Sequence, residues 1–483
     1  MMKTKYNSIY HILIVLLLIA TGCKTYKPVV TPELKKVPDN FIEPGKDSTG
    51  IGNIQWHAFF KDSLLVKLID TALANNQDIQ IAWQRIESAK AQLLKNKGAL
   101  QPTVNAAVST AIDKYGKYTM SGVGNYDTNL SGNINDKQRV TQPIVQDYFI
   151  GLRSNWEIDI WGRLKNARKA SAARVLASEK GRQFIVTSLV ADIASSYYDL
   201  LALDNQLKII QRNIKYQQDA LDVVKIMQET GKSTSLAVQQ FQAQLYNTQG
   251  YEYEAKQQIT AIEAHINYLL GRYPQPVERD SSTLKKQLPQ IIYAGIPSAM
   301  ITRRPDVQEA ALELQATKFD VASASAAFMP ALNITPYFGL NSFKGNLLFN
   351  TASVTYGLLG GLTSPLFNKK AIEGNYQLAG AAQKEAFYKY QQSLLNSFNE
   401  VYIGLNDIKN KRHIQKLKQL EVNELSNGVT SANELYVAGY ASYLEVITAQ
   451  KSVLQAELEL NDNRKDVLIA LVQLYRSLGG GWQ

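Results

Sequence analysis

The stretch Tyr148–Asp159, with the sequence YFIGLRSNWEID, indicates the fold more clearly than any other part of the chain. Apolar and polar side chains alternate along it, and an extended strand places alternate side chains on opposite faces. The apolar positions are Tyr148, Ile150, Leu152, Trp156 and Ile158, and the polar positions are Gly151, Arg153, Asn155, Glu157 and Asp159. A strand with large aromatics on one face and charges on the other fits a membrane barrel, which meets lipid outside and water inside.

Three further segments show the same period of two. A weaker match in the first half consists of Val104, Ala106, Val108 and Ile112. Two matches in the second half consist of Leu332, Ile334, Pro336, Phe338 and Leu340, and of Val354, Tyr356, Leu358 and Leu362. We predict strands over about 103–116, 146–160, 331–343 and 352–365. The connection 117–142 is rich in Gly, Asn, Asp and Ser, so we predict a long loop there.

Long helices are predicted next to these strands. Between Arg163 and Thr230 there is no proline, and Gly181 is the only glycine. If this span is wholly helical, it extends about 100 Å at the usual rise per residue. A turn follows Thr230, and a second helical stretch then completes an antiparallel hairpin over 163–272. The second half of the chain predicts a similar hairpin over 369–478.

The second half repeats the first. Lys90 and Pro102 recur as Lys318 and Pro330, both displaced by 228 residues. The group Gly231, Leu236, Val238 and Gln242 recurs, displaced by 208 residues, as Gly439, Leu444, Val446 and Gln450. We therefore predict two structural repeats, 61–273 and 301–483, each of which opens with a helix and continues with two strands and a helical hairpin. The opening helix of the first repeat is expected over Lys61–Leu100, and an inter-repeat linker over 274–300.

The N-terminus has the pattern of a secretory signal peptide over 1–22. Lys3 and Lys5 precede an apolar stretch, and small residues precede Cys23, the only cysteine. The stretch resembles a bacterial lipoprotein cleavage box, with Ala20 where such boxes usually carry leucine. We expect a covalent lipid on Cys23 and an extended, lipid-anchored tether over 23–60. The alternative is an ordinary secretory signal that ends near a cysteine.

Four strands per chain cannot close a barrel. An open sheet edge in lipid leaves backbone groups unpaired, at a cost of about several kcal/mol each. Eight strands from a dimer would enclose only side chains, whereas twelve strands from a trimer leave a lumen. The expected fold is therefore mixed α and β: a trimeric, twelve-stranded transmembrane barrel continued by a long, antiparallel coiled-coil tunnel, with internal duplication.

Composition gives no sign of catalysis or of nucleic-acid binding. The net charge of +10 is spread along the chain rather than clustered. The four histidines lie far apart, and the phosphate-binding, zinc-protease and serine-hydrolase motifs are all missing from the sequence. We expect no enzyme activity, no metal site, no nucleic-acid partner and no cofactor other than the lipid.

The segment Ile301–Val307 contains Arg303, Arg304, Pro305 and Asp306. It resembles the signature that opens the second repeat in the outer-membrane efflux protein family of the TolC type, within the branch of lipoproteins that serve drug and metal pumps. The resemblance extends from about Trp56 to Leu478. By itself the motif indicates a helix start, because proline suits the first helical position and aspartate the positive helix end.

The two predicted hairpin turns resemble the family's tips, which form the closed periplasmic end of the channel and meet the adaptor protein. Glycine supplies the positive φ that such a turn needs. The residues implied in adaptor contact are Gly231, Ser233, Ser235, Leu236, Gly439, Ser442 and Leu444.

Glu445 lies where family members often carry an acidic residue that lines the tunnel near its constriction. Three copies around an axis would favour cations. The resemblance implies further gate or pore-lining roles for Tyr440, Tyr443 and Thr448. Ala441 replaces a residue that can be a gate arginine, so the gate is expected to rest on tyrosines and packing. The alternative for Glu445 is a solvated helix carboxylate.

The resemblance implies a homotrimeric channel, lipid-anchored in the bacterial outer membrane. It would take drugs, metal ions or other small molecules from an adaptor and an inner-membrane pump of the resistance-nodulation-division type. Conduction would be passive, with opening by untwisting of the inner coiled-coil pairs. A trimeric structural lipoprotein or surface stalk is the alternative, and it predicts continuous heptads without duplicated strands. A substrate-specific uptake barrel would need more strands per chain.

Overall fold

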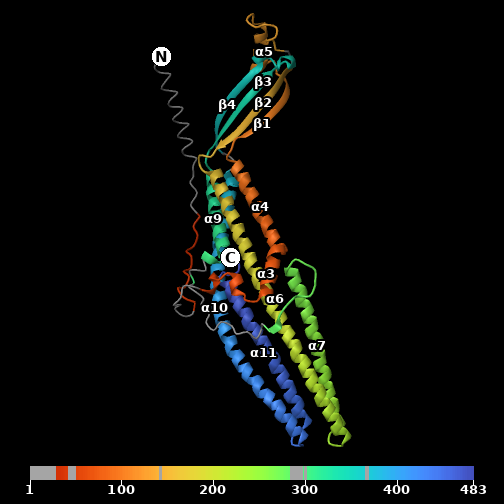
Figure 1. Ribbon diagram of the computed structural model, residues 1–483. Coiled ribbons are helices and arrows are strands. Elements are labelled where there is room, and N and C mark those ends of the chain that lie inside the picture. The colour runs from red at the N-terminus through yellow and green to blue at the C-terminus, as the bar shows by residue number, and fades with distance from the viewer. Residues whose placement is uncertain (1–28, 42–49, 141–143, 283–296, 298–301, 365–368) are drawn as a thin grey trace. The chain divides into compact units, whose positions relative to one another are not determined.

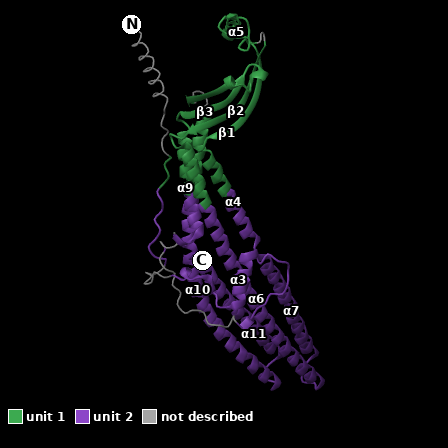
Figure 2. Cartoon of the chain, turned by 45° about the horizontal axis from the view of Figure 1, so that its top comes forward, with its two compact units in different colours: residues 1–32, 89–175, 314–386 green, residues 33–88, 176–313, 387–483 purple. Residues whose placement is uncertain are grey.

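The computed structural model describes residues 29–41, 50–140, 144–282, 297, 302–364 and 369–483. The expected signal peptide and Cys23 lie outside the described residues, as does most of the expected linker after residue 282. Figures 1 and 2 show two compact units. The strand unit comprises 89–175 and 314–386 with the residues up to 32, and the helical unit comprises 33–88, 176–313 and 387–483.

The strand unit contains one antiparallel sheet in the order β1-β2-β3-β4. Its strands are β1 (Thr103–Lys114), β2 (Ile144–Ile158), β3 (Ala331–Ser342) and β4 (Val354–Thr363). Each end lies within two residues of the sequence expectation. Leu152 pairs with Ala106 on one side and Phe338 on the other, and Phe338 pairs with Tyr356. The rows of apolar residues therefore align across all four strands.

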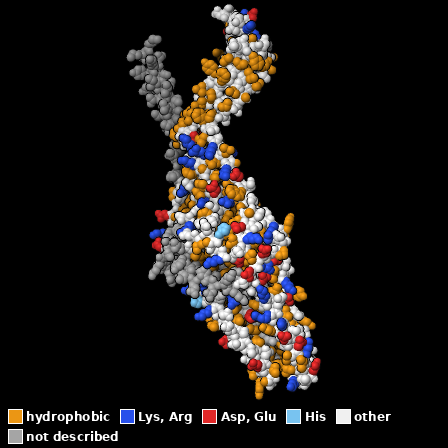
Figure 3. All heavy atoms as spheres, viewed as in Figure 1, with side chains coloured by type: hydrophobic (Ala, Val, Ile, Leu, Met, Phe, Trp, Pro, Cys, Tyr) orange, Lys and Arg blue, Asp and Glu red, His pale blue; other side chains and the backbone are white. Residues whose placement is uncertain are grey.

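One face of this sheet is apolar and uncovered within the chain. Val108, Tyr356 and Leu358 are 80%, 78% and 73% exposed. Figure 3 shows apolar side chains gathered over the strands, whereas charged side chains are spread over the helices. Such a surface suits contact with lipid tails and would be costly in water.

The other face carries polar residues and one buried ring. Phe149 is 4% exposed, and the guanidinium of Arg153 lies 4.4 Å from its ring centre. Gly151 and Gly339 are paired across β2 and β3 beside this ring. A Cβ on Gly151 would lie 2.3 Å from the carbonyl oxygen of Phe338. The Phe149 ring thus packs against two paired glycines. A larger residue at either position would collide with the ring or with the neighbouring strand.

The connection predicted as a loop between the first two strands is partly helical, which corrects that expectation. It contains α5 (Met120–Leu130), whose first turn is capped because the Thr119 hydroxyl accepts a hydrogen bond from the Gly122 amide at 3.1 Å. The Gly and Asn content of α5 masked its helical tendency. The corresponding connection in the second repeat, 343–353, holds only two short 3-10 turns, η3 (Gly345–Leu347) and η4 (Thr351–Ser353).

The duplication is visible in the helix bounds. In the first repeat the helices are α3 (Ser63–Asn75), α4 (Gln77–Gly98), α6 (Arg163–Glu229) and α7 (Ser235–Leu269). In the second they are α9 (Pro305–Ala326), α10 (Lys369–Val437) and α11 (Tyr443–Ser477). Both ends of α4 and α9 differ by 228 (305 − 77 and 326 − 98), and both ends of α7 and α11 by 208 (443 − 235 and 477 − 269). The offset falls from 228 to 208 residues mainly because the connection between β1 and β2 is longer than the connection between β3 and β4.

Two expectations about the N-terminal part are wrong. The single helix expected over 61–100 breaks at Asn76, whose side-chain oxygen accepts from the Ile79 amide while its nitrogen donates to the Leu269 carbonyl. The expected tether ends earlier than residue 60, because Trp56 and Phe60 are 4% and 3% exposed in the core of the helical unit. They lie in or beside the short helix α2 (Trp56–Phe59), which follows η1 (Ile51–Asn53). The apolar burial of two large aromatics outweighs the Pro- and Gly-rich composition upstream.

The core of the helical unit is built around the middle of α6. Ile193, Tyr197 and Leu200 are fully buried there, against α3 and the end of α7. Among the described helices, α6 alone is long and apolar enough by composition to cross a membrane, but 56% of that stretch is buried, as in a core helix. The Tyr197 hydroxyl donates to the Asp62 carboxylate at 2.9 Å. Burial and the nearby Asp62 charge raise the pKa of Tyr197, so it remains a donor at physiological pH.

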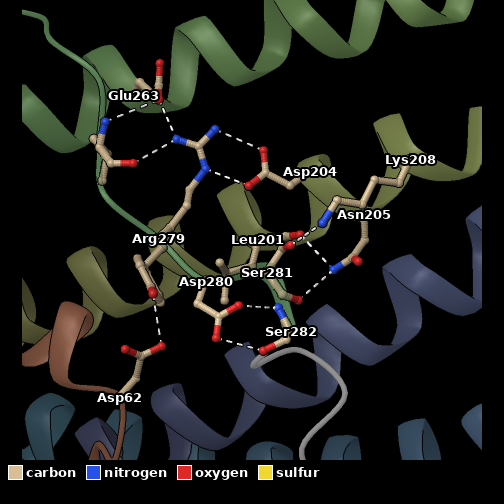
Figure 4. A network of polar contacts seen from close by, with 12 residues as sticks. Asp62, Leu201, Asp204, Asn205, Lys208, Glu263, Arg279, Asp280, Ser281 and Ser282 are labelled. Carbon is tan, nitrogen blue, oxygen red and sulfur yellow. Dashed lines mark hydrogen bonds and ion pairs between the residues drawn. The ribbon is translucent and has the colours of Figure 1, made fainter. Parts of the chain in front are cut away.

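The segment after α7 is fastened by Arg279 (Figure 4). Its guanidinium makes two hydrogen bonds, of 2.6 and 2.9 Å, to the Asp204 carboxylate on α6. It also donates to Glu263 on α7 at 2.5 Å. The hydrogen bonds that Arg279 donates to Asp204 and Glu263 raise its pKa despite its burial. One cation therefore ties α6, α7 and the segment leaving the first repeat together.

Arg304 plays the corresponding part in the second repeat. It is 4% exposed and makes a two-pronged ion pair with Asp306, at 3.0 and 2.7 Å. A third nitrogen donates to Glu400 on α10 at 2.6 Å and to the Ser477 carbonyl at the end of α11 at 3.0 Å. Pro305 is the first residue of α9 and Asp306 lies in its first turn, as the sequence predicted. The Arg-Arg-Pro-Asp motif therefore connects three helices of the helical unit.

Gly151→Ala should destabilise the sheet, because the added methyl group meets the Phe338 carbonyl and the Phe149 ring. We expect a loss of about 1–3 kcal/mol, seen as a lower temperature of dissociation of the purified oligomer on denaturing gels. Gly124→Ala, in α5 and away from the sheet edges, is the control, since nothing lies within 4 Å of a Cβ placed there. Equal effects of the two substitutions would show that packing at Gly151 is not critical.

Arg304→Met should lower the free energy of unfolding of the helical unit by about 3 kcal/mol, because Asp306 and Glu400 lose their shared cation. Denaturant titration followed by circular dichroism measures this loss. The neighbouring variant Arg303→Met removes the same charge outside this network and should cost about 0.5 kcal/mol or less. The role assigned to Arg304 is wrong if both variants unfold at the same denaturant concentration.

Candidate functional site

The edges of the sheet are the first functional feature. Within the described part of the chain, β1 and β4 each have a neighbouring strand on one side only. Their free edges carry backbone groups that have no water partner in a membrane. Pairing β1 of one copy with β4 of the next satisfies both edges and closes a barrel, which the chain cannot do alone.

The second functional feature is the pair of hairpin tips, where α6 meets α7 and α10 meets α11. Gly231 has φ 73° and Gly439 has φ 82°, so both turns use the left-handed backbone that glycine favours. After the first turn, the Thr234 hydroxyl caps α7 by accepting from the Ala237 amide at 3.2 Å. Ser235 is the first residue of α7. The second tip reaches the same backbone path with different capping chemistry.

At the second tip, Ser442 and Glu445 form a reciprocal capping box at the start of α11. The backbone amide of Ser442 donates to a Glu445 carboxylate oxygen at 2.5 Å. Glu445 is exposed, as is Thr448 one turn further on. The carboxylate thus has a local structural role. Its place along the pore, like that of Tyr440, Tyr443 and Thr448, stays a prediction.

The predicted tip residues differ in burial. Leu236 and Leu444, which are equivalent in the two repeats, are 54% and 55% exposed. Tyr440 is 85% exposed, whereas Tyr443 packs against a cluster that includes Phe241 and Val446. Each chain therefore has an exposed leucine at the equivalent position of both tips.

Several polar contacts join the first hairpin to the second near the tips, and sequence reasoning missed their partners on the second hairpin. Ser233 lies 3.1 Å, oxygen to oxygen, from the Tyr436 hydroxyl on α10. Further along α6, Arg212 pairs with Glu457 on α11 at 2.5 Å, and Asn213 donates to the same carboxylate at 3.1 Å. The sequence gives no local signal for these pairs, because the partners lie 203 to 245 positions apart.

The described residues include no group of three or more His, Cys, Asp or Glu side chains arranged to hold a metal ion. Some of their charged side chains form ion pairs, as Arg279 does with Asp204 and Glu263.

Comparison with known proteins matches the family model described as "Outer membrane efflux protein" to residues 68–272 and 296–480. The cation efflux system protein CusC of Escherichia coli is 28% identical over 438 residues, which cover 89% of each chain. The pyoverdine export outer membrane protein OpmQ of Pseudomonas putida is 29% identical over 429 residues, covering 89% of this chain and 88% of that protein.

Solved structures agree in fold. A crystal structure of a membrane protein from Pseudomonas aeruginosa has a TM-score of 0.83 at 25% identity, covering 95% of this chain and all of that one. A crystal structure of CusC has a TM-score of 0.79 at 26% identity, with the same coverage. The family match covers both repeats and most of the chain. The chain therefore belongs to the outer membrane efflux protein family, whose members are trimeric, non-enzymatic outer-membrane channels of tripartite efflux systems.

Proposed function

We propose that this protein is a passive efflux channel whose hairpin tips bind a periplasmic adaptor protein. An inner-membrane pump of the resistance-nodulation-division type would supply the cargo and the energy. The observation that carries this proposal is the pair of tips with the same backbone path, each with an exposed leucine at the equivalent position, in every chain. A trimer presents six such tips, so an adaptor could meet the same leucine at regular intervals around the channel.

The proposed cargo is broad: drugs, metal ions or other small molecules. Relatives that are 27 to 29% identical are named for a cation, for pyoverdine and for toluene. Nearly equal likeness to channels with such different cargo supports selection by the pump rather than by the channel wall.

We further propose that the gate lies at the tips and opens when the hairpins separate. The Ser233–Tyr436 and Arg212–Glu457 contacts would have to break in that movement, since each joins the first hairpin to the second. Glu445, Tyr440, Tyr443 and Thr448 would line the pore near this constriction. A lipid on Cys23 would add an anchor beside the barrel.

The stalk alternative is not retained. It required continuous heptads without duplicated strands, whereas β1 and β2 in the first repeat and β3 and β4 in the second form one sheet. The family match across both repeats likewise assigns the chain to channels.

Replacing both tip leucines by aspartate, Leu236→Asp with Leu444→Asp, should abolish efflux-dependent resistance in cells while the trimer still forms. Burying a carboxylate against the adaptor costs far more than burying leucine, so docking should weaken by about a hundredfold or more. Cross-linking to the adaptor in cells measures docking. Tyr246→Asp, also on exposed α7 surface, is the control. Unchanged cross-linking in the double variant would remove the leucines from the adaptor contact.

Glu445→Gln should reduce the preference of the open channel for cations over anions by roughly twofold or more, since three carboxylates leave the pore. Glutamine can replace glutamate in a capping box, so this change removes the charge and keeps the helix start. Reversal potentials in planar bilayers under a salt gradient measure the preference. The matched control is Glu278→Gln, an exposed carboxylate of the segment after α7. An unchanged reversal potential for Glu445→Gln would place this carboxylate outside the pore.

A further inference from the structure

A cavity of about 500 Å³ lies between the two hairpins of the helical unit. Helices α6 and α7 line one side of it, and α10 and α11 line the other. Arg212, Asn213, Tyr436 and Glu457, which take part in polar contacts between the hairpins, are part of its wall. Its size is within the range of small-molecule sites.

Two glutamines in this wall are buried without hydrogen-bond partners. Gln217 on α6 is 1% exposed, and neither its amide nitrogen nor its amide oxygen is paired. Gln450 on α11 is 5% exposed, and its amide oxygen is unpaired. Unpaired buried polar groups are rare in folded proteins, because each loses its bonds to water. Both glutamines line the cavity, which therefore offers one unpaired amide nitrogen, with its two N–H groups, and two unpaired amide oxygens.

The rest of the wall restricts what can bind. Val224, Phe241 and Val446 are each 1% exposed and give the cavity an apolar part. Arg212 and Glu457 are paired with each other at 2.5 Å, and Asp219, the third ionic group of the lining, is exposed to solvent, so no buried charge in the wall calls for a charged ligand. The complementary molecule is therefore uncharged.

We infer that this cavity is a binding site for an uncharged small molecule with a primary carboxamide on an apolar body. A primary carboxamide has one acceptor and two N–H donors, which complement the unused donor of Gln217 and the unused oxygens of Gln217 and Gln450. The apolar body would lie against Val224, Phe241 and Val446. Because residues of both hairpins line the site, a bound molecule stabilises the arrangement of the two hairpins in which the cavity is present.

The test uses the purified full-length trimer and the probe 1-naphthaleneacetamide, followed by its fluorescence. We expect saturable binding to the wild-type protein, with 1-naphthaleneacetate, the charged analogue, binding at least about tenfold more weakly. Gln217→Leu and Gln450→Leu should each weaken amide binding by about tenfold, the effect of one lost hydrogen bond to a buried group. Both variants should stay folded, because each removes an unpaired buried amide.

The matched control is Gln240→Leu, an exposed glutamine on α7 outside the cavity, which should bind the amide as the wild type does. Three results would each overturn the inference: no saturable binding up to the solubility limit of the amide, equal binding of the amide and the acetate, or undiminished binding to both cavity variants. If one cavity variant fails to form trimers, the other decides the outcome by the same comparison.

Discussion

The need to pair every backbone group in the membrane governs this protein. Each chain supplies only four strands, and the sheet ends in two open edges at β1 and β4. Water cannot satisfy these edges inside a lipid bilayer, so they must be paired by neighbouring chains. An oligomer follows from this constraint, and the trimer of the family supplies twelve strands, enough to leave a lumen. The apolar rows through Leu152 and Phe338 then face lipid, and the opposite face is left for a lumen.

Duplication gives one chain two copies of each part, but the copies have diverged in chemistry while keeping their geometry. The helix bounds of α7 and α11 are offset by the same number at both ends. Thr234 caps the first by its hydroxyl, whereas Ser442 caps the second together with Glu445. Glycine therefore keeps the backbone path of the two turns the same. The capping residues can differ, because several side chains can accept a hydrogen bond from a free amide at a helix start.

The two buried arginines show how the long helices are kept in place. Helices α6 and α10 have 67 and 69 residues, so a small change in direction at one end becomes a large displacement at the other. Arg279 and Arg304 concentrate charged hydrogen bonds where the segments after α7 and before α9 meet these helices. Bidentate pairs of this kind fix orientation as well as distance, so they hold one end of each hairpin. The contacts nearer the tips are single bonds or small networks, which suits a part of the molecule that must move.

The sequence by itself determined the strands, the long helices, the glycine turns and the duplication. Each of these is a local pattern, either a period of two, an absence of breakers or a repeated spacing, and local patterns are written in consecutive residues. The tertiary structure decided the helix break at Asn76, the burial of Trp56 and Phe60, the helix α5 and the bridge between Ser233 and Tyr436. These depend on contacts between residues that are distant in sequence, or on capping that outweighs composition. No spacing in the chain marks Tyr436 among its 26 tyrosines, because only the packing of one hairpin against the other gives it a partner.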